Sequence, residues 1–182
     1  MKLHNLTSVL ILAVAFVSST QAAPSTMSLA ATPSYRIIKE LDELPFKEVT
    51  DLVYDSDELL WMATRNGLYC YDNYRIRPYR RDGRHPDMLS DNEVKRVSED
   101  RQQRIWIATA QGLDRLDKKT GYIEHLVPTK SQIHSITELM VTHEGTIWVA
   151  SDDGFFYYLP DDDVPHPVRI LNNRGEPIRY GQ

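Results

Sequence analysis

One short phrase occurs three times along the 182 residues of this chain, and each copy is centred on a tryptophan. The tryptophans are separated by 45 and 42 residues. An apolar residue stands on both sides of each tryptophan, and a glycine follows six residues later. A fixed repeat of this length indicates a supersecondary unit that buries its apolar face only by stacking on copies of itself. The defining positions are Trp61 with Gly67, Trp106 with Gly112, and Trp148 with Gly154.

Each copy contains four short segments with the composition of β-strands, separated by turns. The segment around Trp106 is apolar on both faces, which suits a strand that is covered on each side by another sheet. Four strands form one blade of a β-propeller, so we predict an all-β fold: a partial β-propeller of about three four-stranded blades in an incomplete ring. The expected strands are 49–54, 59–64, 68–72 and 75–80, then 94–99, 104–109, 113–117 and 122–126, then 136–141, 146–150, 155–159 and 168–171.

The amino terminus has the features of a secretory signal peptide. Met1 and Lys2 give a positive start, residues 9–17 are uninterruptedly apolar, and small residues lead to Ala22. A retained membrane anchor is the alternative, but this apolar run is far shorter than the roughly 20 residues that span a bilayer. We therefore expect an exported, periplasmic protein. The predicted organisation is a signal peptide at 1–22, a leader with a possible outer strand at 23–43, blades at 44–88, 89–133 and 134–172, and a tail at 173–182.

Charge and cysteine content exclude two classes of function. The net charge of −5 gives no basic footprint for phosphate groups, so we do not expect nucleic acid as a partner. Cys70 is the one cysteine of the chain and has no disulfide partner within it. It stands in a strand-like run without the neighbouring histidine and Asn or Asp signature of a thiol nucleophile. We interpret Cys70 as a small core hydrophobe.

The repeat resembles the two-component regulator propeller repeats that form the extracytoplasmic sensor region of hybrid histidine kinases from Bacteroidetes. That family's repeat has a hydrophobic start, an Asp, a Gly, an aliphatic-Trp-aliphatic core that ends in Thr, and a Gly-Leu turn. In the second copy, the matching residues are Val94, Asp100, Trp106, Thr109 and Gly112. The polar linker 79–90, which ends in Leu-Ser, also looks like the connection between blades in those proteins.

The resemblance implies a ligand-sensing propeller segment of a truncated hybrid two-component sensor that responds to oligosaccharides derived from polysaccharides. It implies no enzyme activity and no cofactor for this chain, because the kinase of the family lies in a region outside it. The alternative is a stand-alone secreted propeller fragment with a structural or protein-interaction role and no part in signalling.

Two positions depart from the family pattern. The aspartate six residues before the tryptophan is present as Asp55 and Asp100, whereas the third copy has Thr142. The glycine of the same turn is kept only as Gly145, and Glu58 and Gln103 take its place earlier in the chain. We therefore expect the first two turns to have a conformation that is open to larger residues.

The turns just before the repeated glycines carry the candidate ligand-binding residues. Equivalent loops of stacked blades cluster at one rim, and binding groups commonly lie on loops that a rigid scaffold carries. Ordinary solvated turns are the alternative for each residue. We expect the three tryptophans to be core residues and not a platform for stacking sugars, because they stand in apolar strands at a fixed register. The candidates are Arg65, Asn66, Gln111, Asp152 and Asp153.

Neither a metal centre nor a catalytic constellation is predicted. Runs of aspartate at 152–153 and 161–163 have the oxygen ligands of calcium, but their spacing does not match the twelve-residue calcium loop. Solvated acidic turns are the simpler interpretation. The sequence has no nucleophile elbow and no phosphate loop. The histidines beyond the signal peptide are dispersed and none pairs at the spacing of a zinc site: His85, His125, His134, His143 and His166.

Three blades leave two blade faces without a neighbour. Each such face would expose ~400 Å² of apolar surface, worth about 10 kcal/mol at ~25 cal/mol/Å². That free energy is comparable with the whole stability of a domain, roughly 5 to 15 kcal/mol. We therefore expect the chain to be a fragment, a truncated reading frame or one part of a split gene. Further blades from the same or another chain, or a homodimer, are the expected partners.

Overall fold

The computed structural model describes residues 48–85, 88–126, 135–152 and 154–176 of the chain. These residues belong to the second of two compact units, Pro45–Gln182. The predicted signal peptide, the leader and Asp153 lie outside the described residues. No helix within these ranges has both the length and the apolar character needed to cross a membrane.

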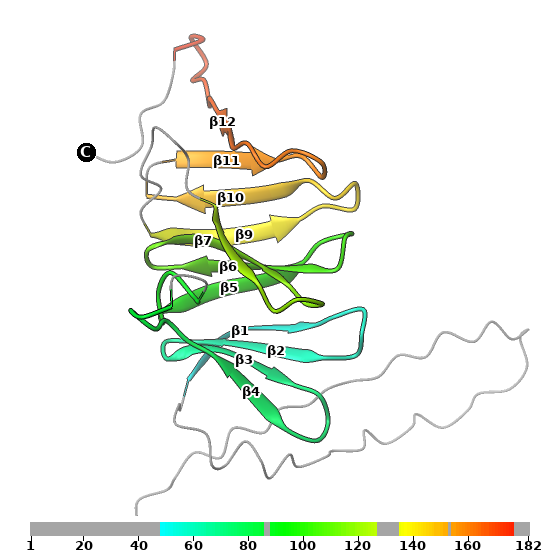
Figure 1. Cartoon of the computed structure of the whole chain (residues 1–182). Helices are drawn as coiled ribbons and strands as arrows, with labels where there is room; N and C mark the ends of the chain where they lie inside the picture. The colour runs from blue at the N-terminus through cyan, green and yellow to red at the C-terminus, as the bar shows by residue number, and fades with distance from the viewer. Residues whose placement is uncertain (1–47, 86–87, 127–134, 153, 177–182) are drawn as a thin grey trace, which may run out of the picture. The chain divides into compact units, whose positions relative to one another are not determined.

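The described residues form three four-stranded antiparallel sheets, which we call the first, second and third sheet (Figure 1). In each sheet the strands lie in chain order, so every strand pairs with the next one along the sequence. The prediction of an all-β partial propeller with three four-stranded blades is confirmed. The strands are β1 Val49–Tyr54, β2 Leu60–Thr64, β3 Gly67–Tyr71 and β4 Ile76–Tyr79, then β5 Val94–Glu99, β6 Arg104–Thr109, β7 Gly112–Asp117 and β8 Ile123–Leu126, then β9 Ile136–Val141, β10 Ile147–Ser151, β11 Gly154–Tyr158 and β12 His166–Val168.

The last strand corrects the sequence prediction. We expected it at 168–171, after the final proline of the loop, but β12 spans His166–Val168 and includes Pro167. Pro167 pairs with Phe156 at the outer edge of the sheet. An edge strand tolerates proline, because the missing N–H can lie on the side without a neighbouring strand.

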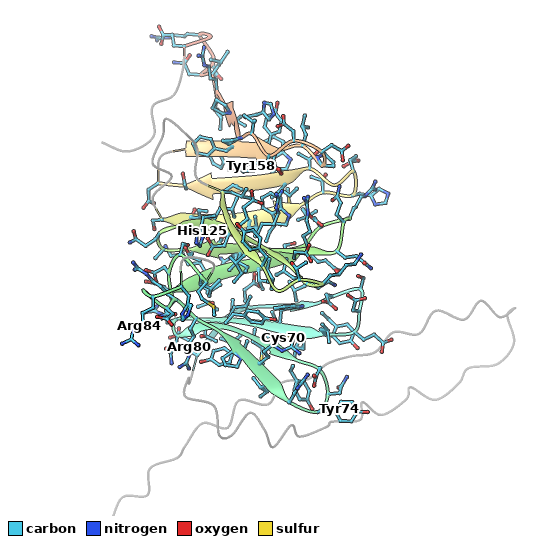
Figure 2. All side chains as sticks on the ribbon, in the orientation of Figure 1. Cys70, Tyr74, Arg80, Arg84, His125 and Tyr158 are labelled. Atoms are coloured by element: carbon cyan, nitrogen blue, oxygen red, sulfur yellow. The ribbon has the colours of Figure 1, made fainter. Side chains whose placement is uncertain are left out.

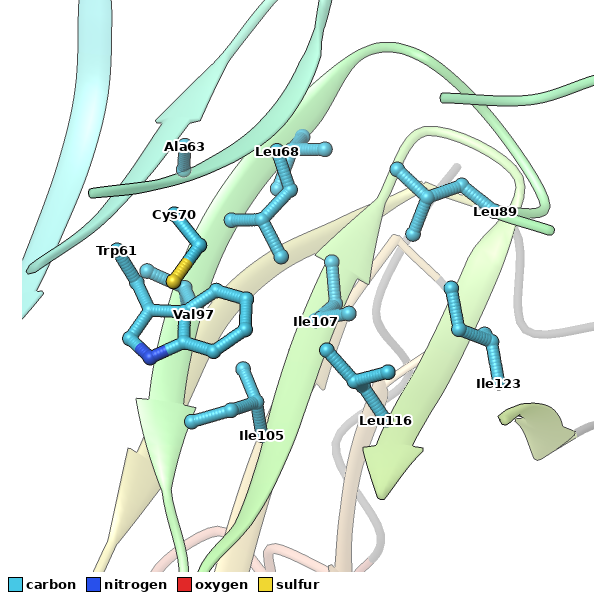
Figure 3. Packing of buried hydrophobic residues seen from close by; sticks show 11 residues of the cluster. Trp61, Ala63, Leu68, Cys70, Leu89, Val97, Ile105, Ile107, Leu116 and Ile123 are labelled. Carbon is cyan, nitrogen blue, oxygen red and sulfur yellow. The ribbon is translucent and has the colours of Figure 1, made fainter. Parts of the chain in front are cut away.

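The sheets stack through opposite faces. We call the face that carries the tryptophan the indole face, and the other side of the same sheet the reverse face. On the indole face of the first sheet, Trp61 and Cys70 pack against Val97, Ile105 and Ile107 of the second sheet (Figure 3). The remaining buried members of this cluster are Ala63, Leu68, Leu89, Val94, Leu116 and Ile123.

The second and third sheets meet in the same way. Trp106 on the indole face of the second sheet packs in one cluster with residues of the third sheet. Its indole lies 5.4 Å from the ring of Tyr158, centroid to centroid. The stacking explains why β6 is apolar on both faces, since it lies between the first and third sheets and its apolar residues are all buried. The third-sheet members of the cluster are Ile136, Ile147, Val149, Phe156 and Tyr158.

Trp148 corrects the expectation that all three indoles are core residues. Trp61 and Trp106 are each 1% exposed, whereas Trp148 is 37% exposed. The indole faces of the first and second sheets are covered by the next sheet, and the described residues place no sheet on the indole face of the third. Position in the repeat therefore fixes which way the indole points, but burial depends on a following sheet.

Candidate functional site

The candidate ligand residues lie in the β2–β3, β6–β7 and β10–β11 turns, which we call the hairpin rim (Figure 1). A hydroxyl holds each turn, and in the first two sheets this hydroxyl is buried. Thr64 Oγ1 donates to Gly67 O at 2.7 Å and accepts from Asn66 N at 2.9 Å. Thr109 repeats these two bonds with Gly112 O and Gln111 N, at 2.9 and 3.2 Å. Ser151 donates to Gly154 O at 3.2 Å, so the repeated Thr or Ser has a structural role in the turn.

The glycines after these turns have backbone conformations that side chains rarely adopt. Gly67, Gly112 and Gly154 have φ of 114°, 147° and 131°. At Gly67 an added Cβ would lie 2.5 Å from the carbonyl oxygen of Tyr79, so this position has no room for a side chain. The rigid turns fix the backbone of the residues between hydroxyl and glycine.

The structure brings the predicted residues to one side of the three sheets. Arg65, Gln111 and Asp152 are exposed and Asn66 is half-buried, while Asp153 lies outside the described residues. Arg65 Nε lies 3.6 Å from Glu48 Oε2, the one ion pair found at these positions in the described part of the chain. Their role in ligand binding stays a prediction.

Linkers join the turns of neighbouring sheets. Gly67 N donates to Asn92 O at 2.7 Å, and Ser135 N donates to Ala110 O at 3.2 Å. The turn of the first sheet thus contacts the segment that leads into the second, and the turn of the second contacts the segment that leads into the third. These bonds hold the three turns along a single edge.

A polar network around the buried Asp114, beneath the second turn, was missed from the sequence. Asp114 Oδ1 lies 2.7 Å from His125 Nδ1, and Asp114 Oδ2 accepts from Ser90 N at 2.8 Å and from Ser90 Oγ at 3.0 Å. Ser90 Oγ also lies 2.9 Å from Thr109 Oγ1. The network therefore connects the linker, the hydroxyl that holds the Gln111 turn, and the outer strand β8. Figure 2 shows His125 on the side of the hairpin rim.

Asp114 breaks the repeat pattern at a core position. The equivalent residues two positions after the repeated glycines are Tyr69 and Phe156, both buried. Burial raises the pKa of Asp114, and the hydrogen bonds from His125 and Ser90 oppose this effect without cancelling it. Aligning the three copies on their glycines would have found this residue, because a carboxylate stands where the other copies have an aromatic ring.

The order of contacts in this network does not suit nucleophilic catalysis. A nucleophilic serine needs an adjacent general base. Here the carboxylate of Asp114 lies between Ser90 and His125, and Ser90 Oγ contacts Asp114 and Thr109. Cys70 is also poorly suited, since burial raises its pKa to about 11.

The turns at the other ends of the tryptophan strands carry the repeated aspartate, and we call this side the aspartate rim. Trp61 Nε1 donates to Asp55 Oδ2 at 2.8 Å, while Asp57 N and Leu59 N donate to Asp55 Oδ1, each at 2.9 Å. Burial raises the pKa of Asp55, but bonds from Trp61, Leu59 and Lys118 outweigh it, so the net pKa is lowered. The carboxylate thus fixes both the turn and the indole.

Asp100 has the same role in the second sheet. Its Oδ2 accepts from Trp106 Nε1 at 2.7 Å and from Arg104 Nε at 2.7 Å. The guanidinium carbons of Arg104 and Arg115 lie 5.9 and 5.4 Å from the Trp106 ring centroid. In the third sheet Thr142 Oγ1 accepts from Thr146 N at 3.2 Å. A hydroxyl there preserves part of the turn.

Three carboxylates of the aspartate rim lie close enough to hold a cation. Oxygen atoms of Asp55, Asp57 and Glu99 lie within 4.8 Å of one another. Lys118 Nζ contacts these carboxylates at 3.0, 2.6 and 2.6 Å. Burial lowers the pKa of Lys118, but the hydrogen bonds that its ammonium donates to the three carboxylates raise the pKa above the usual range. The ammonium thus occupies the centre of the cluster and ties the second sheet to the first.

Several other acidic and histidine positions also have partners from the protein. His85, His125 and His166 each pair with a different aspartate, at 2.7, 2.7 and 2.8 Å. Asp163 pairs with Arg115. His134 lies outside the described residues. A shallow hollow of about 330 Å³ at the aspartate rim, between the second and third sheets, is lined by Ser98, Glu99, Asp100, Arg101, Val141, Thr142 and His143.

Comparison with known proteins agrees with the repeat. The family model described as "Two component regulator propeller" matches residues 88–111, which include the linker, β5 and β6. No curated protein matches the sequence significantly.

Solved structures share the fold at low identity. The extracellular domain of BT3049 from B. thetaiotaomicron, described as a hybrid two component system, is 19% identical with a TM-score of 0.57, covering 69% of this chain and 19% of that chain. The corresponding domain of BT4673 from the same organism is 20% identical with a TM-score of 0.54, covering 70% and 21%. The chain therefore spans about one fifth of the length of these sensor domains.

An enzyme has the same fold. Virginiamycin B lyase from Staphylococcus aureus is 15% identical with a TM-score of 0.54, covering 68% of this chain and 42% of that chain. Likeness at this identity shows the fold and leaves the activity open. The described part of the chain is three blades of a β-propeller, and its residues 88–111 match the two component regulator propeller family model.

Proposed function

We propose that the chain is an extracytoplasmic, ligand-sensing propeller segment of a hybrid two-component sensor. The observation that carries this proposal is the match of residues 88–111 to the two component regulator propeller family, within a stack of three such blades. The extracellular sensor domains of BT3049 and BT4673 have the same fold and support an exported, periplasmic location. The whole sensor includes parts that these three blades do not supply.

We further propose that the ligand is an oligosaccharide derived from a polysaccharide, bound at the hairpin rim. Arg65, Gln111 and Asp152 are exposed there on turns of fixed backbone, and they offer one cation, one amide and one carboxylate. These groups can hydrogen-bond to the hydroxyls of a sugar, and their relative positions would determine which sugar is recognised. The rigid turns lower the entropy cost of binding.

The proposed role is binding without catalysis and without a cofactor. Ser90 is hydrogen-bonded to a carboxylate, and burial suppresses the reactivity of Cys70. The carboxylate cluster of the aspartate rim already holds the ammonium of Lys118. These features support a module that binds a ligand and transmits the binding event to the rest of the sensor.

Isothermal titration calorimetry on the full chain tests the ligand, with a panel of neutral and acidic oligosaccharides as probes. We expect at least one to bind, with a loss of about tenfold in affinity for Arg65→Ala or Gln111→Ala, since a lost hydrogen bond to a charged or polar group costs about 1.5 kcal/mol. The matched control is Arg101→Ala, an exposed arginine at the aspartate rim. Absence of binding across the panel, or equal losses for Arg101→Ala, would overturn the oligosaccharide proposal.

A stand-alone protein-interaction segment is the second candidate function, because the indole face of the third sheet exposes large apolar side chains. It predicts a protein ligand and no effect of the hairpin-rim variants.

A further inference from the structure

One half-buried arginine of the described residues differs from the others in its partners. Arg96, Arg104 and Arg115 are buried or half-buried, and each binds a carboxylate, at 2.6, 2.7 and 2.6 Å. Arg80 follows β4 and is half-buried, but no carboxylate of the described residues contacts it. Its contacts are neutral: Nη2 donates to Tyr69 Oη, and the guanidinium carbon lies 5.5 Å from the centroid of the Tyr69 ring. The positive charge of Arg80 is therefore not compensated within its surroundings.

The position of Arg80 is fixed by the first turn of the hairpin rim. A Cβ added to Gly67 would lie 2.8 Å from Arg80 Cγ, so the turn packs directly on the stem of the arginine. The Nε atom is buried and has no hydrogen-bond partner among the described atoms. A buried charge without a counterion is costly, and salt screens it less than an exposed one. An anion beside Arg80 would thus be attracted more strongly than an anion beside an exposed arginine.

Three further arginines belong to the same edge of the first sheet. Arg65 lies in the turn itself, and Arg81 and Arg84 follow in the linker; all three are exposed. Asn92 holds the linker to the turn, because Arg81 N donates to Asn92 Oδ1 at 2.8 Å and the turn glycine donates to Asn92 O at 2.7 Å. Figure 2 shows Arg80 and Arg84 on the same side of this sheet. We call Arg65, Arg80, Arg81 and Arg84 the arginine cluster.

Two carboxylates make only loose ion pairs with the cluster. Arg65 Nε lies 3.6 Å from Glu48 Oε2, and Arg81 Nη1 lies 4.0 Å from Asp91 Oδ2. These arginine side chains are 68% and 57% exposed. Exposed pairs at such distances contribute little free energy, because water and salt screen them. An anionic ligand would therefore lose little by competing with these two carboxylates.

A third carboxylate, that of Asp82, is used by the linker itself. Asp82 Oδ2 lies 2.7 Å from His85 Nδ1, and Asp82 Oδ1 accepts from Arg84 N at 3.0 Å. These contacts fix the backbone of the linker turn. They leave the guanidinium of Arg84, like that of Arg80, without a carboxylate in the part of the chain that the structure describes. These two guanidinium groups are the ones that an anion can bind.

We propose that the arginine cluster binds a carboxylate or sulfate group of an acidic oligosaccharide. This inference rests on the proposed function and narrows the class of its ligand. Guanidinium groups bind both anions through paired N–H donors, which gives geometric selectivity as well as attraction. Arg80 anchors the anion because its charge is the least screened, and Arg84 adds exposed donors from the linker.

Calorimetric titration of the full chain with two matched pairs of saccharides tests the proposal. The first pair is tetragalacturonate and its methyl ester, and the second is a sulfated galactan tetrasaccharide and its desulfated form. The members of a pair share a sugar backbone and differ in charge, so the two pairs distinguish a carboxylate from a sulfate. We expect at least one acidic form to bind about tenfold more tightly than its uncharged counterpart at ~20 mM salt, with a smaller difference at ~200 mM salt.

Substitutions locate the anion. Arg80→Gln and Arg84→Gln should each weaken binding of the acidic form about tenfold, and should weaken binding of the uncharged form less. Arg84 is exposed, so Arg84→Gln still gives a result if Arg80→Gln does not fold. The matched control is Arg101→Gln, an exposed arginine at the aspartate rim, which should change neither affinity.

Each contrary outcome has its own meaning. Equal affinities within both pairs, or binding of uncharged saccharides alone, would overturn the inference and leave the proposed function standing. Absence of binding by every saccharide would overturn both. Unchanged affinity in Arg84→Gln, or an equal loss in Arg101→Gln, would place the anion outside the arginine cluster and overturn the inference. Tighter binding to phosphatidylglycerol vesicles than to either acidic saccharide would assign the cluster to a membrane surface and also overturn it.

Discussion

Trp106 and Trp148 stand at the same position of consecutive repeats, yet their surroundings differ. Trp106 lies close to two guanidinium groups, donates a hydrogen bond to Asp100 and packs against the third sheet. Trp148 has Thr142 in place of the aspartate and is 37% exposed. The comparison teaches that the repeat encodes a sheet with one face prepared for a neighbour, and that the neighbour supplies much of the stabilisation.

The largest expected difference comes from truncating the two indoles. Trp106→Ala should lower the free energy of unfolding by about 4 kcal/mol, because it leaves a cavity between two sheets. Trp148→Ala should cost about 1 kcal/mol, since its face has no covering sheet. Urea unfolding followed by circular dichroism measures both. Equal losses would break the comparison and show that the face of Trp148 is covered in solution.

The aspartate position gives the next largest effect. Asp55→Ala should cost about 3 kcal/mol, because it leaves the buried Trp61 N–H without an acceptor and removes one of the three carboxylates around the ammonium of Lys118. Thr142→Asp should stabilise the third sheet by about 1 kcal/mol by offering Trp148 the same acceptor. Chemical denaturation of both variants tests the pair. A destabilising Thr142→Asp would mean that the third turn cannot adopt the geometry of the first two.

Substitutions at the glycine position of the aspartate-rim turns should change the free energy of unfolding by about 1 kcal/mol. Glu58 and Gln103 both have φ of 62°, so the first two turns keep the left-handed backbone, and the expectation of a conformation open to larger residues was wrong. Glu58→Gly should therefore stabilise by about 1 kcal/mol, with Glu58→Ala as the control for the lost side chain. Gly145→Ala should lower the stability, because Gly145 has a φ of 92° and an added Cβ would lie 3.1 Å from Arg101 Cδ. Thermal melts rank the three variants, and a neutral Glu58→Gly would contradict the backbone assignment.

The smallest effects concern pH, and they have opposite signs at the two rims. The pKa of Asp55 is lowered in the fold, so its stabilisation is present above the unfolded pKa and is lost as pH falls through the folded value. The pKa of Asp114 is raised, so its contribution is largest below the unfolded pKa and is lost as pH rises through the folded value. Asp114→Asn should thus raise stability at neutral pH relative to acidic pH, and Asp55→Asn should do the reverse. Melting temperatures of both variants and the parent chain, measured from pH 3 to pH 8, test these expectations. Profiles of the variants that run parallel to that of the parent would refute both pKa shifts.

Much of the fold follows from local sequence. Apolar residues on both sides of each tryptophan predicted strands, and β2, β6 and β10 span these residues. The strand β12 was misplaced because proline was taken as a boundary, whereas an edge strand accepts it. Two of the missed site residues, Ser90 and His125, gave no local signal, because each is an ordinary polar residue until it meets Asp114.

The sequence by itself determined the repeat, the strand pattern and the side of each sheet to which its indole points, because strand periodicity and turn chemistry act over a few residues. Only the tertiary structure decided that Lys118 enters the carboxylate cluster of the first sheet, that Asp114 joins the linker to β8, and that Trp148 stays exposed. These outcomes depend on the register between sheets and on the presence of a following sheet. The residue pattern within one strand gives no information about the register between sheets or about a following sheet.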